Sequence, residues 1–189
     1  MKKLFFLCCV GMWLFSCKAQ QVFPLNASTQ NIPSGSYIKD LNNDLDFYIG
    51  TWMSTYRGKT VKLIITKEIK RPYELLGKSL FEDIISIRYE VRDQNNNVLE
   101  STLNYNFGSS KKYVIESNGL NYTNDLNLIY GGTDCKIGRG FLIFKKNGSN
   151  QFLWSYKSRT IFVTDGSCPN YDNIHVYLPE TENLIFTKQ

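Results

Sequence analysis

The sequence predicts an all-β fold, an antiparallel up-and-down meander of about nine or ten strands that closes into a barrel. From Gly50 onward, apolar and polar residues alternate along the chain, and successive side chains of a strand point to opposite faces of a sheet. Turns rich in glycine and asparagine separate the alternating segments, which favours a meander over alternating strands and helices. The chain has 189 residues, a length that suits one domain around one core.

The first 16 residues have the features of a lipoprotein signal peptide. Two lysines precede an apolar run over residues 4–15, which is shorter than the roughly 20 residues that a membrane-spanning helix needs. The run ends in Leu14-Phe15-Ser16-Cys17, which resembles a lipobox and implies cleavage after Ser16 and lipid on the Cys17 thiol. Acyl chains at Cys17 would hold the protein to a membrane. The alternatives are an ordinary secretory signal and an uncleaved membrane anchor.

Two kinds of segment are expected before the first long strand. Residues 17–36 are rich in Gln, Asn, Ser and Pro and have no regular period, which predicts a flexible tether. The one predicted helix covers Ile38–Ile49, because Leu41, Leu45 and Tyr48 recur on a single stripe. We therefore expect a single barrel domain over residues 37–189.

The strands are predicted from segments in which every second residue is apolar. One apolar face per segment is typical of antiparallel sheet. Asn147-Gly148 tolerates positive φ at both turn positions and predicts a tight hairpin between residues 141–146 and 149–157. Residues 57–59 and 94–97 predict two further turns. The clearest alternating segments are Val61–Thr66, Ile85–Val91, Leu99–Phe107, Phe152–Lys157 and Ile174–Leu178.

The cysteines also point to an exported protein. Cys8 and Cys9 lie in the signal peptide and Cys17 is the expected lipid acceptor, so Cys135 and Cys168 remain as an even pair. In an oxidising compartment such a pair predicts a disulfide. The alternative is a metal site that includes His175, but two cysteines and one histidine at wide spacing match no common zinc pattern.

Few residues suit catalysis. His175 is the single histidine, and neither a Gly-x-Ser-x-Gly motif nor a phosphate-binding loop is present. Glu82 and Asp83 are interpreted as solvated turn residues rather than as an acid–base pair. The net charge of +5 falls to +3 when the two signal-peptide lysines are removed, which is too mild to indicate a nucleic-acid partner. We expect a protein that is not an enzyme and uses no metal or cofactor.

A high aromatic content favours a binding protein. Phe, Tyr and Trp make up 14% of the chain, and several of them fall on the apolar side of their predicted strands. In a barrel of this size they could line a cavity for a small apolar or amphipathic ligand. Alternatively they fill the core of an envelope-structural or protein-interaction protein, with loop tyrosines such as Tyr122, Tyr130 and Tyr171 meeting a partner. The ligand-lining candidates are Tyr89, Tyr105, Phe107, Phe152, Trp154 and Tyr156.

Gly50-Thr51-Trp52 follows the predicted helix and opens the first long strand. This arrangement resembles the calycin plan of lipocalins and fatty-acid-binding proteins, which carry a Gly-x-Trp motif at this place. The resemblance implies that Trp52 closes one end of the barrel. Lipocalins usually bring an arginine from near the last strand onto that tryptophan, whereas the last strand predicted here offers Lys188.

Longer stretches resemble a set of lipoproteins of unknown function from Bacteroidetes, common in flavobacteria. In many Bacteroidetes lipoproteins an acidic run just after the lipidated cysteine directs surface exposure. Residues 18–21, Lys-Ala-Gln-Gln, lack such a run. The resemblance therefore implies a lipid anchor in the outer membrane, facing the periplasm rather than the cell surface. The stretches that carry the resemblance are residues 16–20, 37–46, Gly50-Thr51-Trp52 and Leu178-Pro179-Glu180.

Overall fold

In the computed structural model of the chain, residues 19–189 are described, apart from residues 76, 108–110, 162–163 and 165. The predicted signal peptide and the predicted lipid acceptor Cys17 lie outside this part. The described residues form eleven strands and several short 3-10 helices. The strands are β1 (Val22–Pro24), β2 (Tyr37–Lys39), β3 (Gly50–Tyr56), β4 (Lys59–Leu75), β5 (Lys78–Arg92), β6 (Val98–Ser101), β7 (Ile115–Leu120), β8 (Leu126–Tyr130), β9 (Gly140–Asn147), β10 (Gln151–Ser158) and β11 (Leu184–Lys188). The 3-10 helices are η2 (Thr29–Asn31), η3 (Asp46–Tyr48), η4 (Asp134–Lys136) and η5 (Tyr171–Asn173). In this part of the chain no helix is both long and apolar enough to cross a membrane.

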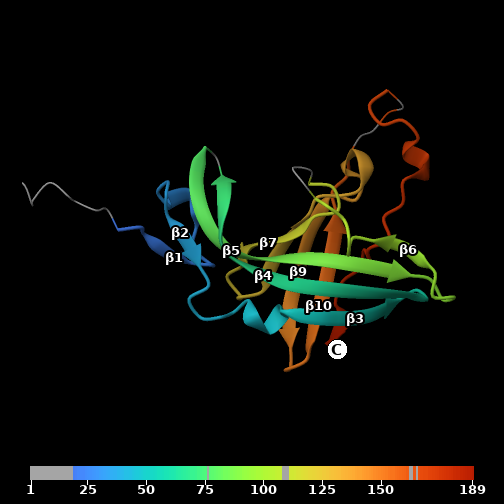
Figure 1. Cartoon of the computed structure of the whole chain (residues 1–189), viewed down its shortest axis with the longest axis horizontal. Coiled ribbons are helices and arrows are strands. Elements are labelled where there is room, and N and C mark those ends of the chain that lie inside the picture. The colour runs from blue at the N-terminus through green and yellow to red at the C-terminus, as the bar shows by residue number, and fades with distance from the viewer. Residues whose placement is uncertain (1–18, 76, 108–110, 162–163, 165) are drawn as a thin grey trace, which may run out of the picture.

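Eight strands form a closed antiparallel barrel, which confirms the predicted meander (Figure 1). β3, β4 and β5 are followed around the barrel by β7, β8, β9, β10 and β11, so neighbours in the sheet are also neighbours in the chain once β6 is set aside. The barrel closes where β11 pairs with β3. Closure removes the free edges that an open sheet would expose.

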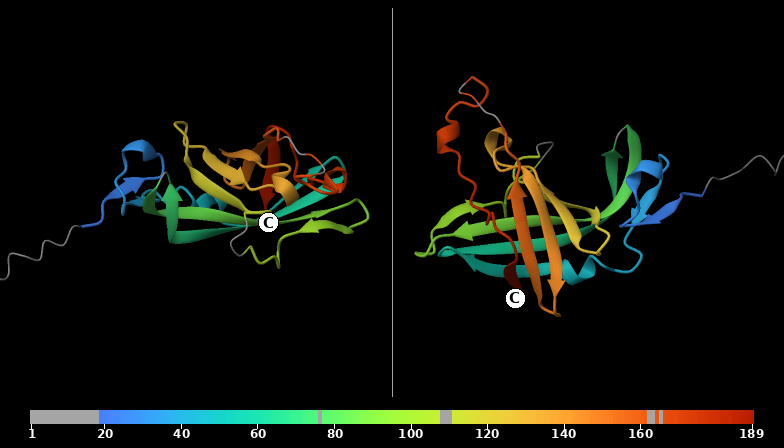
Figure 2. Two further views of the ribbon diagram at one scale, coloured as in Figure 1. Left: turned by 90° about the horizontal axis from the view of Figure 1, so that it is seen from above. Right: turned by 180° about the vertical axis from the view of Figure 1, so that it is seen from behind.

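β5 joins the barrel to the rest of the chain. One edge of β5 pairs with β4, and the other edge pairs in turn with β2, β7 and β6. The hairpin of β4 and β5 therefore extends past the barrel, and β1 and β2 lie along this extension, at the opposite end of the molecule from β6 (Figure 2). The three strands outside the barrel are thus all attached through β5.

Large side chains from inward-facing strand positions fill the interior of the barrel. The ring centroid of Phe152 lies 4.4 Å from that of Phe144, 4.7 Å from that of Trp52 and 5.3 Å from that of Phe186. These four residues and Trp154 are fully buried. Burying a side chain of this size stabilises a fold by about 1.5 to 3 kcal/mol, and rings in contact add to this. The aromatic residues are therefore the main content of the barrel.

The predicted helix over Ile38–Ile49 was wrong. β2 and η3 occupy this stretch, and the turn between them is held by the buried carboxylate of Asp40, which accepts hydrogen bonds from the backbone N–H groups of Asp44 (2.8 Å) and Leu45 (3.1 Å). Leu41, expected on the buried stripe, is 55% exposed. A side chain that bonds to nearby backbone N–H groups offers the chain an alternative to a helix, and here that alternative is preferred.

The tether predicted over residues 17–36 is folded from Val22 onward, so the domain begins earlier than residue 37. β1 pairs in parallel with β2, and Leu25 and Ile32 are buried. The backbone N–H of Leu120 donates to the carbonyl oxygen of Leu25 at 3.1 Å, which ties the segment to β7.

Two predicted strands differ from the structure. The strand predicted over Leu99–Phe107 ends as β6 at Ser101, because the Arg88 guanidinium donates at 2.7 Å to the carbonyl oxygens of both Thr102 and Tyr105 and holds a turn there. Residues 174–178 form no strand. The hairpin at residues 147–148 is confirmed as β9 and β10, with a three-residue loop over 148–150 in place of a two-residue turn.

Candidate functional site

Trp52 lies at the end of the barrel next to η3. Its indole N–H donates to the carbonyl oxygen of Tyr48 at 2.7 Å, and its ring contacts Phe47 and Phe152. The Nζ of Lys188 lies 5.3 Å from the centre of the Trp52 ring and donates to the carbonyl oxygen of Phe47 at 3.2 Å. Lys188 of β11 is therefore the cation that meets this tryptophan, where lipocalins use an arginine.

The six candidate ligand-lining residues separate into two groups. Four of them are packed in the core and almost fully buried: Tyr89, Phe152, Trp154 and Tyr156. Tyr105 and Phe107 lie beyond the end of β6, with their ring centroids 5.4 Å apart. Phe107 lines a hollow of about 580 Å³ on the outside of the barrel, where the Arg88 guanidinium lies 4.7 Å from its ring centre.

Two other sets of predicted residues have clear positions. Cys135 and Cys168 form the predicted disulfide, with their Cα atoms 5.9 Å apart. His175 is exposed, and no group of three or more potential metal ligands occurs among the described residues. Of the loop tyrosines expected at a partner interface, Tyr122 is 96% exposed and Tyr171 is half-buried. Tyr130 instead belongs to β8 and is fully buried, so that expectation was wrong.

Glu82 and Asp83 are not solvated turn residues, because both are buried within β5. The Asp83 carboxylate accepts hydrogen bonds from the Tyr37 hydroxyl and from the backbone N–H groups of Asp40 (3.0 Å) and Lys70 (2.8 Å). These bonds attach β2 and the following turn to the bulge in β4. Asp83 therefore has a structural role. The predicted turn, in which it would be exposed, did not suggest this role.

Burial also changes the pKa of the neighbouring acid, Glu82. Desolvation raises the pKa of Glu82 to about 7, partly offset by the guanidinium of Arg71 and reinforced by Asp83. Arg71 itself lies 2.8 Å from a carboxylate oxygen of Glu116 on β7. A chain of charges thus runs from the buried face of β5 to the outer surface of β7.

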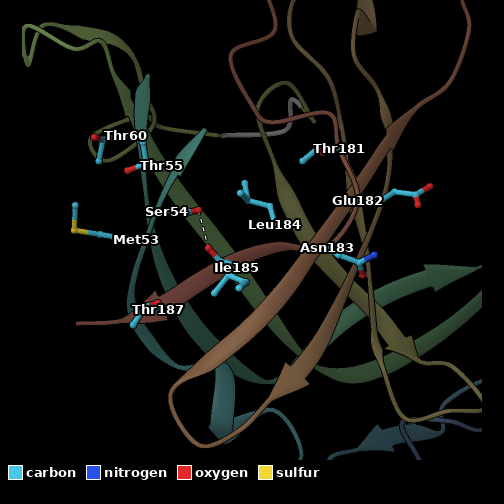
Figure 3. A pocket seen from close by; sticks show the side chains of 10 residues that line it. All are labelled: Met53, Ser54, Thr55, Thr60, Thr181, Glu182, Asn183, Leu184, Ile185 and Thr187. Carbon is cyan, nitrogen blue, oxygen red and sulfur yellow. Dashed lines mark hydrogen bonds between the residues drawn. The ribbon is translucent and has the colours of Figure 1, made fainter. Parts of the chain in front are cut away.

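A shallow hollow of about 640 Å³ lies over the seam where β11 meets β3 (Figure 3). Only two residue pairs join these strands, and beyond them the Ser54 hydroxyl donates to the carbonyl oxygen of Ile185 at 2.7 Å. Its lining carries one charged side chain, Glu182. The hollow has little to orient a ligand, because few polar groups converge on it.

A second hollow, which we call the β7 groove, has a volume of about 620 Å³ and lies on the outer face of β7 and β8. Glu116 and Ile129 form a cross-strand pair on its floor, and their sequence neighbours are buried in the barrel, so these two side chains point outward. Tyr73, from the extension of β4, forms one wall. The loop that contains η4 forms the other.

The wall that contains η4 is fixed by several bonds. Gly131 allows a close approach, because a Cβ atom there would lie 1.8 Å from the carbonyl oxygen of Lys111. The backbone N–H of Thr133 donates to the carbonyl oxygen of Ile137 at 2.8 Å. The Cys135–Cys168 disulfide joins the middle of this loop to a distant part of the chain. The groove therefore has a preformed wall.

Cations outnumber carboxylates in the β7 groove. Lys111 lies 3.1 Å from Glu116, and Lys112 lies 2.6 Å from Asp134, a hydrogen bond that raises the pKa of Lys112. The other two lining cations, Lys136 and Arg139, are exposed and have no carboxylate within 4.0 Å among the described residues. None of these charged groove residues was a sequence-based candidate, because no motif connects them.

Comparisons with known proteins place the chain in a family but give no activity. The model of a family described as "Family of unknown function (DUF6705)" matches residues 1–189. No curated protein and no solved structure matches the chain.

Proposed function

The chain belongs to this family of unknown function, and from that premise we propose that it is a lipid-anchored protein of the cell envelope whose filled barrel is a rigid support. Its contacts with other molecules are made on the outside of the barrel, and it is not an enzyme. This is the second of the two functions that the sequence allowed, the interaction or structural lipoprotein. The packing of the barrel interior is the observation that favours it.

The packing argument depends on five aromatic rings. Phe144, Phe152, Phe186, Trp52 and Trp154 are fully buried, and neighbouring ring centroids lie 4.4 to 5.4 Å apart. These are contact distances for aromatic pairs. A carrier that encloses its ligand needs a cavity of several hundred Å³ lined by such side chains. Here the rings are packed against one another instead, which supports a filled barrel.

The anchoring proposal rests on the lipobox-like Leu14-Phe15-Ser16-Cys17 and on its distance from the domain. Only four residues separate Cys17 from Val22, where β1 begins. Four extended residues span roughly 14 Å. Lipid at Cys17 would therefore keep β1, β2 and the nearby end of the β4–β5 hairpin close to the membrane surface.

Metabolic labelling tests the anchor. Cells that express the full chain are fed an alkyne fatty acid, and we expect label on the wild-type protein and none on Cys17→Ala. Mass spectrometry of the N-terminal peptide should place the acyl groups on Cys17 after loss of residues 1–16. Equal labelling of the two proteins, or an unmodified Cys17 in the mature protein, would contradict lipid anchoring.

Native mass spectrometry tests the filled barrel. The full chain, purified from membranes and released from detergent in the gas phase, should carry no small molecule whose binding depends on the residues inside the barrel. A small molecule that stays bound and is lost only when Phe152 or Trp154 is altered would place a ligand inside the barrel. That result would restore the carrier function and overturn this proposal.

A further inference from the structure

We propose that the β7 groove binds a small amphipathic anion, a molecule with an apolar body and one acidic group. This inference rests on the proposed function in one respect, namely that ligands meet the outside of the barrel. Three features of the groove support it: its shape, its apolar floor and its two cations, Lys136 and Arg139, which have no carboxylate partner among the described residues. All three are independent of the lipid anchor.

The shape of the groove suits a small molecule. Its volume of about 620 Å³ lies within the range of roughly 300 to 1,000 Å³ that is typical of small-molecule sites. Tyr73 comes from the extension of β4, whereas Ile129 comes from β8. Walls from separate elements enclose a ligand on more than one side, and the disulfide at Cys135 fixes one of them.

The floor offers apolar contact. Ile129 faces outward from β8, and Val114, the largely buried residue before β7, also lines the groove. Ile129 is also paired with Phe141 on the neighbouring strand β9. Phe141 is 45% exposed, and the guanidinium of Arg159 lies 4.2 Å from the centre of its ring. An apolar body in the groove would therefore extend over a partly exposed apolar surface, which commonly marks a binding site.

The charges select an anion. Glu116, the acid on the floor, lies within 3.1 Å of both Arg71 and Lys111, so its charge is compensated. Lys136 and Arg139 lie on the same short loop, held by a backbone hydrogen bond of 2.9 Å from Arg139 to Lys136. Both residues line the groove, and a guanidinium and an ammonium can together bind one carboxylate or phosphate group.

Photolabelling of the full acylated chain in phosphatidylcholine nanodiscs tests the site. The probe is 4-benzoylbenzoate, an aromatic anion that reacts with nearby C–H bonds under light, and the comparison compound is its cationic analogue 4-(aminomethyl)benzophenone. We expect saturable labelling of the peptides that contain Val114 and Ile129 by the anion and much weaker labelling by the cation. Labelling outside the groove, or equal labelling by both compounds, would overturn the proposal.

Paired variants test the role of the two cations. The Lys136→Ala/Arg139→Ala protein should need about 10 to 100 times more probe for half-maximal labelling, the loss expected for a charge-assisted contact. Lys39→Ala/Lys145→Ala removes two exposed positive charges elsewhere and should behave as wild type. Unchanged labelling of the first variant, or an equal loss in both, would show that the groove does not recognise the acid.

A third variant changes the floor without touching the core. Ile129→Asp places a carboxylate under the ligand and should reduce labelling by the anion while it increases labelling by the cation. An intact Cys135–Cys168 disulfide and an unchanged near-ultraviolet circular dichroism spectrum would show that each variant is folded. If Ile129→Asp binds the anion as wild type does, the ligand lies elsewhere.

The anion could come from solution or from the membrane, and the lipid composition separates the two sources. If phosphatidylglycerol in the nanodisc prevents labelling, the acidic group is that of a lipid headgroup. If labelling persists, the groove takes a free small molecule. Because acylation of Cys17 is verified by mass before each experiment, a failure of labelling on an acylated protein counts against the groove alone and leaves the proposed function standing.

Discussion

At the residue scale, Lys188 occupies a position that the calycin resemblance assigns to an arginine. Its ammonium lies 5.3 Å from the Trp52 ring centre and donates a hydrogen bond to Phe47. A cation over an indole contributes about 0.5 to 1 kcal/mol at an exposed site, and the hydrogen bond contributes about as much. A lysine can therefore perform the same contact at this end of the barrel.

Replacing Lys188 should consequently destabilise the fold. We expect Lys188→Met to lower the free energy of unfolding by about 1 to 2 kcal/mol, measured by urea denaturation, and Lys188→Arg to keep most of it. Lys157→Met, at an exposed position of β10, is the control and should change little. A Lys188→Met protein as stable as wild type would show that the contact between Lys188 and Trp52 does not stabilise the fold.

Glu82 predicts a pH dependence of stability. Burial raises its pKa from 4.5 to about 7, so between these pH values the folded protein holds a proton that the unfolded chain has lost. Stability therefore falls as the pH rises from about 5 to 8, by at most about 3 kcal/mol from this group. Glu82→Gln should remove that fall.

The measurement compares the two proteins at pH 5 and pH 8. The free energy of unfolding of Glu82→Gln, relative to wild type, should be higher at pH 8 than at pH 5 by about 2 to 3 kcal/mol. Other titrating groups, such as the partly buried Glu100, are shared by both proteins and cancel. The same difference at both pH values would show that Glu82 keeps its proton affinity on folding.

At the scale of elements, period-two alternation was enough to find the long barrel strands, because burial of one face depends on the local sequence. It failed wherever a distant side chain decides the local backbone. Asp83 lies 43 residues from Asp40 and accepts a hydrogen bond from its backbone N–H, which fixes the start of the turn that the Asp40 carboxylate holds in place of the predicted helix. Likewise, Arg88 ends β6 by bonding to carbonyl oxygens 14 and 17 residues away.

Asp83 should hold the N-terminal strands in place. Asp83→Asn cannot accept all three of its hydrogen bonds equally well, and buried groups without a partner cost about 1 to 3 kcal/mol each. We expect faster hydrogen exchange at the amides of β1 and β2, with the strands β8 to β10 little affected. Asp172→Asn, at an exposed position, is the control. Uniform exchange changes throughout the barrel would argue against a local role.

The disulfide links two segments that have few other described bonds to each other. Closing the loop between Cys135 and Cys168, which are separated by 33 positions in the sequence, should stabilise the fold by about 3 to 4 kcal/mol in the chain-entropy description. In urea denaturation, the free energy of unfolding of Cys135→Ala/Cys168→Ala should be lower than that of wild type by this amount. Wild type should become as unstable as the variant when a reductant is added. A reductant that leaves wild-type stability unchanged would contradict this contribution.

At the scale of the whole molecule, the candidate site is harder to predict than the fold. Tyr73, Ile129 and Arg139 meet in one groove although they come from three elements, and no spacing in the sequence connects them. The pairing of β5 with β7, which places β7 beside the β4–β5 hairpin, skips β6. Such a site becomes visible only once the register of the closed barrel is known.

The filled barrel makes a last prediction about the molecule as a whole. Phe152 touches Trp52, Phe144 and Phe186 at the centre of the core, so Phe152→Ala should leave a dry apolar void and cost about 3 to 5 kcal/mol of stability. An apolar void of this kind takes up xenon. Nuclear magnetic resonance under xenon pressure should therefore shift core methyl signals, such as those of Leu63 and Leu128, in the variant and leave them in place in wild type. Shifts of the same size in wild type would mean that the barrel already contains an internal cavity. The proposal that the protein acts through its outer surface would then be contradicted.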